Sequence, residues 1–393
     1  MALDIPAIQE ALRAERLDGW LLYDFHGSNP VANRLAGLAG APKLATRRWY
    51  YLIPATGQPT GLVHAIERHN LDALPGEKLV YAGRERLAEG VAALVAGRTR
   101  VAMEYSPKGA IPYLARVDAG TIEAIREHGV EVVSSGDLVQ RFEACWDEAA
   151  IRTHHEASER LYRIKDRAFD ALASRVRAGT PTTEYALQQL MVEWFTEEGL
   201  VSDSAPVVAC GPNAGNPHYQ PGPRGSAAIG SDELVLLDLW GKLPQPGAVY
   251  ADITWVGHTG TAVPDEQAGA FAAIAAARDA AIELVQQSAR AGADLRGWQV
   301  DRAARTVLQD AGYDAHILHR TGHSLGEEVH GNGVHMDDYE THDDRRLLPG
   351  SGFTIEPGVY FDRFGVRTEV NVVYGRTDAP VTGPVQSAIL VLG

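Results

Sequence analysis

The first part of the chain alternates helical and strand-like patterns of apolar residues. Helical spacing is seen near its start, at Ile8, Leu12 and Leu17. Short apolar runs typical of strands follow at 20–23, 48–53, 61–64, 99–103 and 130–134. The second and third of these runs flank Thr56-Gly57-Gln58-Pro59, which predicts a hairpin. This part is therefore expected to be an α/β domain.

A break at Ser134-Ser135-Gly136 is followed by a polar helical segment that begins near Trp146. We place a domain boundary there, with an N-terminal domain over 1–143 and a second domain over 144–393. In the second domain, Thr180-Pro181 is interpreted as a helix cap with a first-turn proline. Another helix is predicted to begin at Pro264, with its core face at Phe271, Ile274, Ile282 and Val285.

The second domain contains a faint internal repeat. Segments 179–184 and 292–297 each open an amphipathic helix, and a histidine-bearing stretch follows each helix. Each half then supplies two acids on strand-like segments: Asp238 and Asp252 first, then Glu356 and Glu369. Two similar halves facing each other would bring all four acids into one central cleft.

Composition and charge narrow the classes of function. The 393 residues are 45% hydrophobic and 22% charged, which is ordinary for a globular protein. A net charge of −15 argues against nucleic acid or an anionic membrane as the main partner. Only two cysteines are present, which favours a reducing cytoplasm. The start Met1-Ala2-Leu3 shows no signal-peptide pattern, and no apolar run is long enough to cross a membrane. A cytoplasmic protein that crosses no membrane is therefore expected.

The four acids carry the chemistry. Asp238 and Glu356 stand in or at the end of apolar strand-like runs, and Glu369 alternates with Arg367 and Asn371. Burying an isolated carboxylate is expensive, so such acids need cationic partners. Together with His323 they predict a site for two divalent cations, which can share a hydroxide and polarise a scissile carbonyl.

The segment around His323 allows two other interpretations. His319 and His323 have the spacing of a zinc helix, but Gly322 breaks the helix and the glutamate of that motif is missing. Gly322-His323-Ser324-Leu325-Gly326 also fits the nucleophile elbow of an esterase. The chain after Ser324 is a poor helix, and His342 is the last histidine, which leaves little room for a catalytic acid.

At these residues, from about Trp146 to the end, the chain resembles the pita-bread metallopeptidases, and among them the Xaa-Pro dipeptidases (prolidases) and Xaa-Pro aminopeptidases. The resemblance implies an α/β, creatinase-like N-terminal domain, followed by an α+β pita-bread catalytic domain with an internal pseudo-twofold repeat. It also implies that Asp238 binds one metal, that Asp252 and Glu369 bridge two, and that His323 and Glu356 complete the second. The metal is expected to be Mn²⁺, with Co²⁺ or Zn²⁺ as alternatives. A homodimer is the family expectation.

The resemblance also assigns catalytic and substrate-binding roles. Glu356 would move the proton from water to the leaving proline nitrogen. His218 and His330 would contact the substrate and the tetrahedral intermediate, and Arg367 would hold neighbouring carboxylates. His342 stands where prolidases tend to have the arginine that binds the dipeptide's carboxylate, so His342, Arg345 and Arg346 are the candidates for that contact.

The sequence thus predicts a two-metal hydrolase that cleaves the Xaa-Pro bond of dipeptides, with a small peptide carrying proline in second position as its substrate. The first alternative is an Xaa-Pro aminopeptidase acting on longer peptides. Alternatives from other classes are a non-catalytic pita-bread binding protein, a metal-free amidinohydrolase similar to the creatinases, and the Gly-x-Ser-x-Gly esterase.

Overall fold

The computed structural model describes residues 3–39 and 45–393. Met1 and Ala2, the first residues of the N-terminal segment considered above, lie outside that part. The chain forms two compact units, Met1–Glu143 and Ala144–Gly393, and each is described by itself. In the described part of the chain, no helix is both long and apolar enough to cross a membrane.

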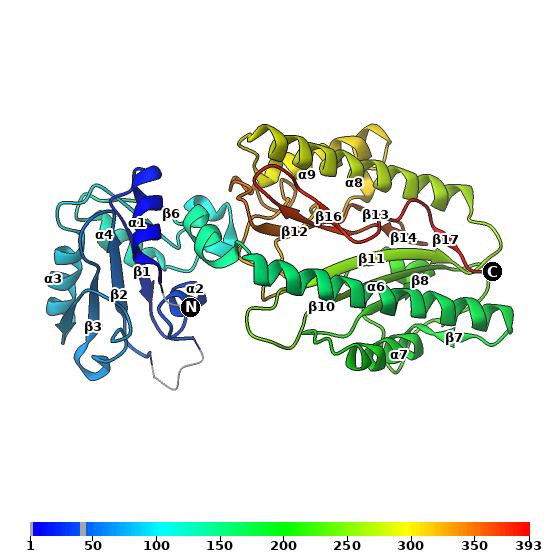
Figure 1. Ribbon diagram of the computed structural model, residues 1–393, viewed down its shortest axis with the longest axis horizontal. Helices are drawn as coiled ribbons and strands as arrows, with labels where there is room; N and C mark the ends of the chain where they lie inside the picture. Colours follow the sequence, from blue (N-terminus) through cyan, green and yellow to red (C-terminus); the bar gives the residue numbers. More distant parts are fainter. Residues whose placement is uncertain (1–2, 40–44) are drawn as a thin grey trace. The chain divides into compact units, whose positions relative to one another are not determined.

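The first unit is built on one mixed sheet with the strand order β4-β3-β2-β1-β5-β6 (Figure 1). Every residue of the central strands β1 and β2 is buried, because helices pack on both faces of the sheet. The predicted hairpin is confirmed, since β2 and β3 pair antiparallel. The strands are β1 (Gly19–Asp24), β2 (Trp49–Pro54), β3 (Thr60–His64), β4 (Glu77–Tyr81), β5 (Arg100–Met103) and β6 (Glu131–Ser134). The helices are α1 (Ile5–Ala14), α2 (Pro30–Leu35), α3 (Arg84–Val95), α4 (Ala119–Arg126) and α5 (Gly136–Val139).

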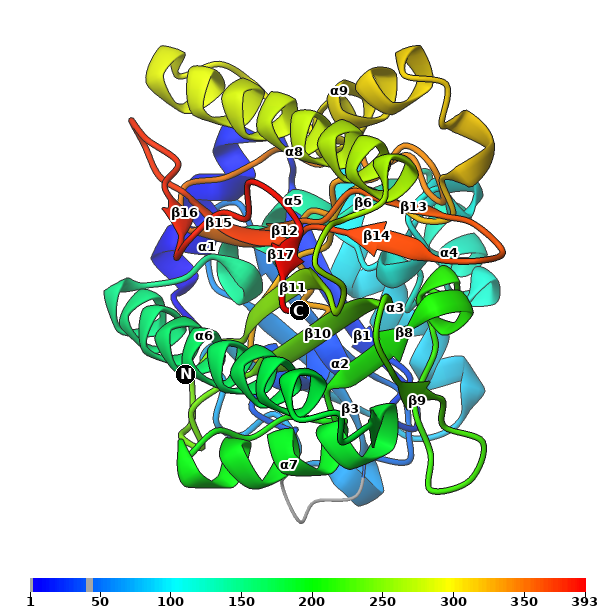
Figure 2. The same cartoon turned by 90° about the vertical axis from the view of Figure 1, so that its right-hand side faces the viewer.

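In the second unit, two pairs of helices enclose the strands, as Figure 2 shows. One apolar core lies between the first helix pair and one face of β10 and β11. A second core lies between the other helix pair and the strands that follow it in sequence. The helices are α6 (Glu148–Arg177), α7 (Glu184–Glu197), α8 (Asp265–Ala291) and α9 (Gly297–Asp310). The strands between the two layers therefore have few positions open to solvent, and polar residues on them need partners.

The strands of this unit form several small sheets. The largest has the order β17-β11-β10-β8, and its register places Asp238 opposite Thr254 and Trp240 opposite Asp252. A second sheet has the order β12-β15-β16, while β13 pairs with β14 and β7 with β9. The strands are β7 (Thr182–Thr183), β8 (Val207–Cys210), β9 (Ala228–Ile229), β10 (Leu234–Gly241), β11 (Ala251–His258), β12 (Ser351–Ile355), β13 (Gly358–Tyr360), β14 (Gly365–Arg367), β15 (Val370–Tyr374), β16 (Val381–Thr382) and β17 (Leu390–Val391).

Two local predictions were wrong. Helix α7 is not capped at Thr180-Pro181 but at Thr183, whose Oγ1 accepts the N–H of Ala186 (3.1 Å), because the intervening residues pair as β7. The alternating segment around Glu369 is not one strand either. β14 ends at Arg367 and pairs with β13, whereas β15 begins at Val370 and pairs with β12. Glu369 lies where the chain passes from one sheet to the other.

Candidate metal centre

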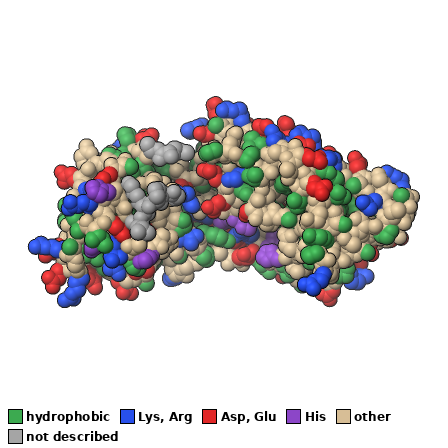
Figure 3. All heavy atoms as spheres, turned by 90° about the horizontal axis from the view of Figure 1, so that it is seen from below, with side chains coloured by type: hydrophobic (Ala, Val, Ile, Leu, Met, Phe, Trp, Pro, Cys, Tyr) green, Lys and Arg blue, Asp and Glu red, His purple; other side chains and the backbone are tan. Residues whose placement is uncertain are grey.

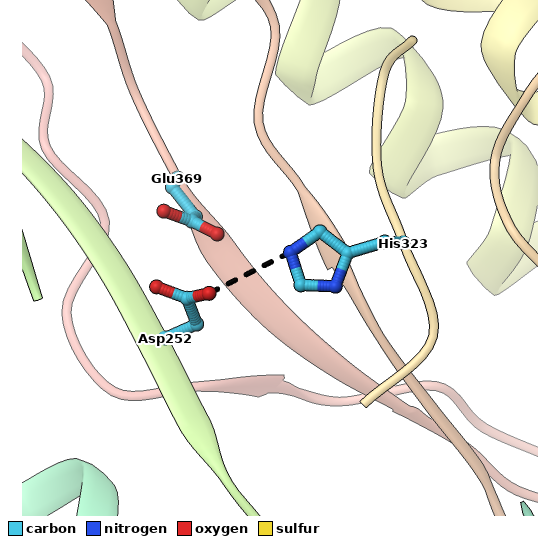
Figure 4. A group of neighbouring side chains, drawn as sticks. All are labelled: Asp252, His323 and Glu369. Carbon is cyan, nitrogen blue, oxygen red and sulfur yellow. Dashed lines mark ion pairs between the residues drawn. The ribbon is translucent and has the colours of Figure 1, made fainter. Parts of the chain in front are cut away.

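Strand pairing and one loop bring three metal-ligating side chains together. Asp252 on β11, Glu369 before β15 and His323 on the loop after α9 are all buried. One ligand atom from each lies within 4.8 Å of the others. In Figure 4 the two carboxylates and the imidazole point toward one another from these three segments. The three side chains come from positions spread over more than a hundred residues of sequence.

His323 faces the acids through Nε2. This nitrogen lies 3.5 Å from Asp252 Oδ2 and 3.4 Å from Glu356 Oε1. The other ring nitrogen, Nδ1, is 3.2 Å from the carbonyl oxygen of Ser324, to which it donates when it carries the proton. This tautomer leaves Nε2 with a free lone pair directed at the acids, which is the form that binds a metal.

Asp238 and Glu356 join the group through Arg367. The guanidinium donates to Asp238 Oδ2 through Nη2 and lies 3.8 Å from Glu356 Oε2. It also donates to Thr254 Oγ1 (3.0 Å) and to the hydroxyl of Tyr360 (3.1 Å). Arg367 is buried, so its single positive charge is placed among the acids with little solvent screening.

Hydroxyls and amides fix the orientation of the remaining carboxylates. Thr254 Oγ1 donates to Glu369 Oε2 (2.7 Å), and Thr354 Oγ1 lies 3.2 Å from Glu356 Oε1. Thr354 Oγ1 also accepts the backbone N–H of His323 (2.9 Å), so the loop and β12 are held in register. Asn371 clamps the backbone of Asp252, accepting its N–H (3.0 Å) and donating to its carbonyl (2.6 Å).

Burial and mutual repulsion perturb the acids strongly. Burial, reinforced by Asp252, Glu356 and Asp238, raises the pKa of Glu369 well above its ordinary value. Burial also raises the pKa of Asp238 to about 7, although Arg367 opposes that shift. For Glu356, nearby His323, His319 and Arg367 outweigh burial and lower the pKa. Perturbations of this size in several adjacent groups are typical of functional sites.

The donor set fits divalent cations. Four carboxylates face one guanidinium and one imidazole, and this excess of negative charge would be offset by bound dications. Asp252 Oδ1 is buried and has no hydrogen-bond partner among the described residues. An orphaned buried carboxylate oxygen beside a free imidazole nitrogen is a position at which a metal would satisfy both groups.

Sequence reasoning did not identify Tyr360, which links several site residues. Its hydroxyl accepts from Arg367 Nη1 and lies 2.7 Å from His319 Nε2. His319 Nδ1 lies 2.7 Å from the carbonyl oxygen of Arg320, which makes Nε2 the acceptor for the Tyr360 proton. The link depends on the pairing of β13 with β14, and no pattern in the sequence indicates that pairing.

The remaining predicted residues lie in different surroundings. The His330 ring stands edge-on to His323 with centroids 4.3 Å apart, whereas His218 is exposed on the loop after β8. His342 is exposed, stacks on Trp298 and bonds Asp338 through Nδ1 (2.6 Å). Histidine side chains are visible as a group on the face of the molecule seen in Figure 3.

Arg345 and Arg346 differ from His342 in their exposure. Arg345 is buried and donates to both oxygens of Asp343 (2.9 and 2.6 Å) and to the carbonyl of Asn332 (2.8 Å). Arg346 is half-buried, and its backbone forms an isolated bridge with Arg296. Arg345 is therefore already paired within the protein.

Ser324 does not have the setting of a nucleophile elbow. Its hydroxyl is buried and accepts the N–H of Gly333 (3.0 Å). Its backbone bridges to Phe353 on β12. Residues 325–350, all of them described, contain no helix, although the elbow requires a strand before the serine and a helix after it.

Comparison with known proteins identifies relatives of this chain. The chain is similar to the "Probable dipeptidase PepE" of Mycobacterium tuberculosis, with 29% identity over 247 residues, covering 62% of this chain and 60% of that protein. It is also similar to the Xaa-Pro dipeptidase of Lactobacillus delbrueckii subsp. lactis, with 30% identity over 206 residues, covering 52% and 51%. The chain thus spans about 60% or less of the length of these relatives.

A solved structure, that of dipeptidase PepE from Mycobacterium ulcerans, covers the whole chain and is itself wholly covered, with a TM-score of 0.67 and 23% identity. This likeness shows the fold: an α/β unit followed by the pita-bread unit that the sequence predicted. The family model described as Metallopeptidase family M24 matches residues 156–375, more than half of the chain and including all five predicted ligands. The protein therefore belongs to metallopeptidase family M24.

Proposed function

We propose that this metallopeptidase is a two-metal Xaa-Pro dipeptidase. The observation that carries the proposal is the convergence of buried Asp252, His323 and Glu369, with Asp238 and Glu356 joined to them through Arg367. Asp238 would help to hold one cation, His323 and Glu356 would help to hold the other, and Asp252 and Glu369 would contribute to both. When bound, the two cations supply Lewis-acid activation of a carbonyl and of water. A curated relative named Xaa-Pro dipeptidase supports the choice of substrate.

Glu356 is the proposed proton carrier. Its pKa is lowered by nearby His323, His319 and Arg367, which outweigh burial, so the carboxylate is ionised and able to accept a proton. Thr354 Oγ1 at 3.2 Å and the backbone N–H donated to Thr321 O (2.7 Å) hold it at the end of β12. Glu356 would take a proton from the attacking water and deliver it to the leaving proline nitrogen.

His330 and His218 are proposed to contact the substrate. Burial, together with nearby His323 and Arg320, lowers the pKa of His330 to about 4, so the ring is neutral at neutral pH. A neutral imidazole keeps one N–H, which can donate to the carbonyl oxygen as negative charge develops on it. His218, exposed after β8, is proposed as a second such donor.

The terminal carboxylate of the dipeptide needs a cation. Arg345 is buried against Asp343, whereas His342 is exposed and Arg346 is half-buried. We therefore propose that His342 and Arg346 meet the carboxylate, while Arg345 holds the segment that carries them. The other expectations are proposed on the chemistry and the resemblance alone. Mn²⁺ suits oxygen-rich ligation with one imidazole. The cytoplasmic location and the homodimer also stay predictions. So do the internal repeat and the division into a creatinase-like domain at 1–143 and a catalytic domain at 144–393.

A paired assay tests the proposal. The Mn²⁺-loaded protein is given Ala-Pro and Ala-Pro-Ala, and free proline or alanine is measured, with Glu356→Gln as the inactive control. We expect higher kcat/KM for Ala-Pro and two bound metals per chain by elemental analysis. A clear preference for the tripeptide would make the protein an aminopeptidase. A protein that binds no dication would be a non-catalytic relative, and activity that survives exhaustive chelation would favour the amidinohydrolase class.

A further inference from the structure

An aromatic side chain continues the proposed metal site along β10. Trp240 lies directly opposite Asp252 in the β10–β11 register, so both side chains project from the same face of the sheet. Trp240 is half-buried and packs against the apolar cluster that contains Tyr250; Val329, one residue before His330, packs against the same cluster. The indole therefore lies on the face of the sheet that carries Asp252.

At the far edge of the indole stands a carboxylate that the proposed mechanism does not use. Trp240 Nε1 donates to Asp203 Oδ1 (2.7 Å), and Asp203 is exposed. The backbone that carries Asp203 is fixed, because Val201 and Lys242 exchange two backbone hydrogen bonds of 2.9 Å each. The hydrogen bond from Trp240 thus keeps Asp203 about one tryptophan side chain away from the proposed metal ligands.

The charges around this edge are mainly negative. Asp203 and Glu328 both lie close to Tyr250, and the ammonium of Lys242 donates to the carbonyl oxygen of Glu327 (2.5 Å). The Lys242 ammonium also lies 5.2 Å from the centre of the Tyr250 ring. An exposed carboxylate next to an indole is suited to bind a side chain that has an apolar stem and a cationic head.

We propose that Trp240 and Asp203 form the subsite for a basic side chain, lysine or arginine, on the residue that precedes proline. The inference rests on the proposed peptidase function and names its substrate class. The methylene stem would lie along the indole, and the charged head would meet Asp203. The substrate's α-ammonium is not the partner, because it is attached one carbon away from the scissile carbonyl, whereas Asp203 lies a full tryptophan side chain beyond the strand position opposite Asp252.

The test isolates the charged head by comparing Lys-Pro with norleucyl-proline, which has a similar stem without the ammonium. We expect the wild-type kcat/KM to be about fivefold to tenfold higher for Lys-Pro, the effect of one ordinary hydrogen bond. Asp203→Asn keeps an acceptor for the Trp240 N–H and removes the charge, so it should lower Lys-Pro to the level of norleucyl-proline and leave the latter within twofold. Asp203→Lys should favour Glu-Pro over Lys-Pro. Asp170→Asn, an exposed acid on α6, is the matched control and should change neither substrate.

Three results would overturn the subsite: equal rates for Lys-Pro and norleucyl-proline in the wild type, equal losses for both in Asp203→Asn, or the same loss in Asp170→Asn. Failure of the proposed function is a separate result. If peptides without proline are cleaved instead, the ratio is measured with Lys-Ala and norleucyl-alanine. Calorimetric binding of Lys-Pro and norleucyl-proline to Glu356→Gln gives the same comparison without turnover, and equal affinities there would refute the subsite even if no peptide were cleaved.

Discussion

The glycine before His323 is predicted to be essential for the site because there is no space for a side chain. A Cβ added to Gly322 would lie 2.0 Å from the carbonyl oxygen of Thr354 and 2.8 Å from its carbonyl carbon. Both are backbone atoms of β12, and they cannot turn away as the end of a flexible side chain could. Gly322 has no positive φ, so Gly322→Ala tests packing alone.

The size of the effect follows from that contact. A carbon and a carbonyl oxygen approach to about 3.3 Å at closest, so the loop and β12 would have to separate by roughly 1.3 Å. Thr354 holds the His323 N–H (2.9 Å), and Glu356 is two residues further along, 3.4 Å from the imidazole. A misplacement of about 1 Å costs roughly 10²-fold in rate. Overpacking costs about 1–3 kcal/mol of stability, less than the 5–15 kcal/mol typical of a domain, so the variant should fold.

The control is the second glycine of the same pentapeptide. A Cβ on Gly326 would have its nearest neighbour at 3.7 Å, an ordinary contact. We expect Gly322→Ala to lose about two orders of magnitude in kcat/KM and to bind Mn²⁺ more weakly by calorimetry, with circular dichroism showing a folded protein. Gly326→Ala should stay within about twofold of the wild type. If Gly322→Ala kept wild-type activity and metal affinity, the contact with Thr354 would not position His323.

Three further predictions concern other parts of the catalytic unit. Ser324→Ala should keep kcat/KM within about threefold and lose about 1 kcal/mol of stability with the Gly333 hydrogen bond; a fall of three orders of magnitude would revive the serine nucleophile. Arg367→Met should lower the free energy of unfolding of the metal-free protein by about 3–5 kcal/mol, because it leaves Asp238 buried without its cation; an unchanged denaturant midpoint would contradict this. Burial lowers the pKa of His154 from 6.5 to about 4, so the folded protein keeps this ring neutral while the unfolded chain takes up a proton. Stability should therefore fall as the pH drops from about 6.5 toward 4, by about 3 kcal/mol at most, and His154→Gln should flatten that part of the denaturation profile.

Much of the fold could be predicted from local patterns. The α/β character of the first unit, its hairpin at 56–59 and the helix that starts after Pro264 follow from apolar periodicity and turn residues, which act over a few positions. The errors came where strand pairing overrode or was hidden from a local pattern. Thr180-Pro181 has the composition of a helix start, but pairing of β7 with β9 moved the cap to Thr183. The alternation around Glu369 gave no sign that the chain changes sheets there.

The sequence by itself determined the chemistry of the site. Acids in apolar strands must meet cations, because an isolated buried carboxylate is unstable, and this holds whatever the fold. Which atoms meet was decided by the tertiary structure, because it depends on the pairing of segments far apart in the chain. Arg367 donates to Asp238, and the Tyr360 hydroxyl bonds both His319 and Arg367. Trp240 donates to Asp203. These contacts form only because strands and loops pack in one register. That register is set by the summed burial and hydrogen bonding of whole elements, which no local pattern contains.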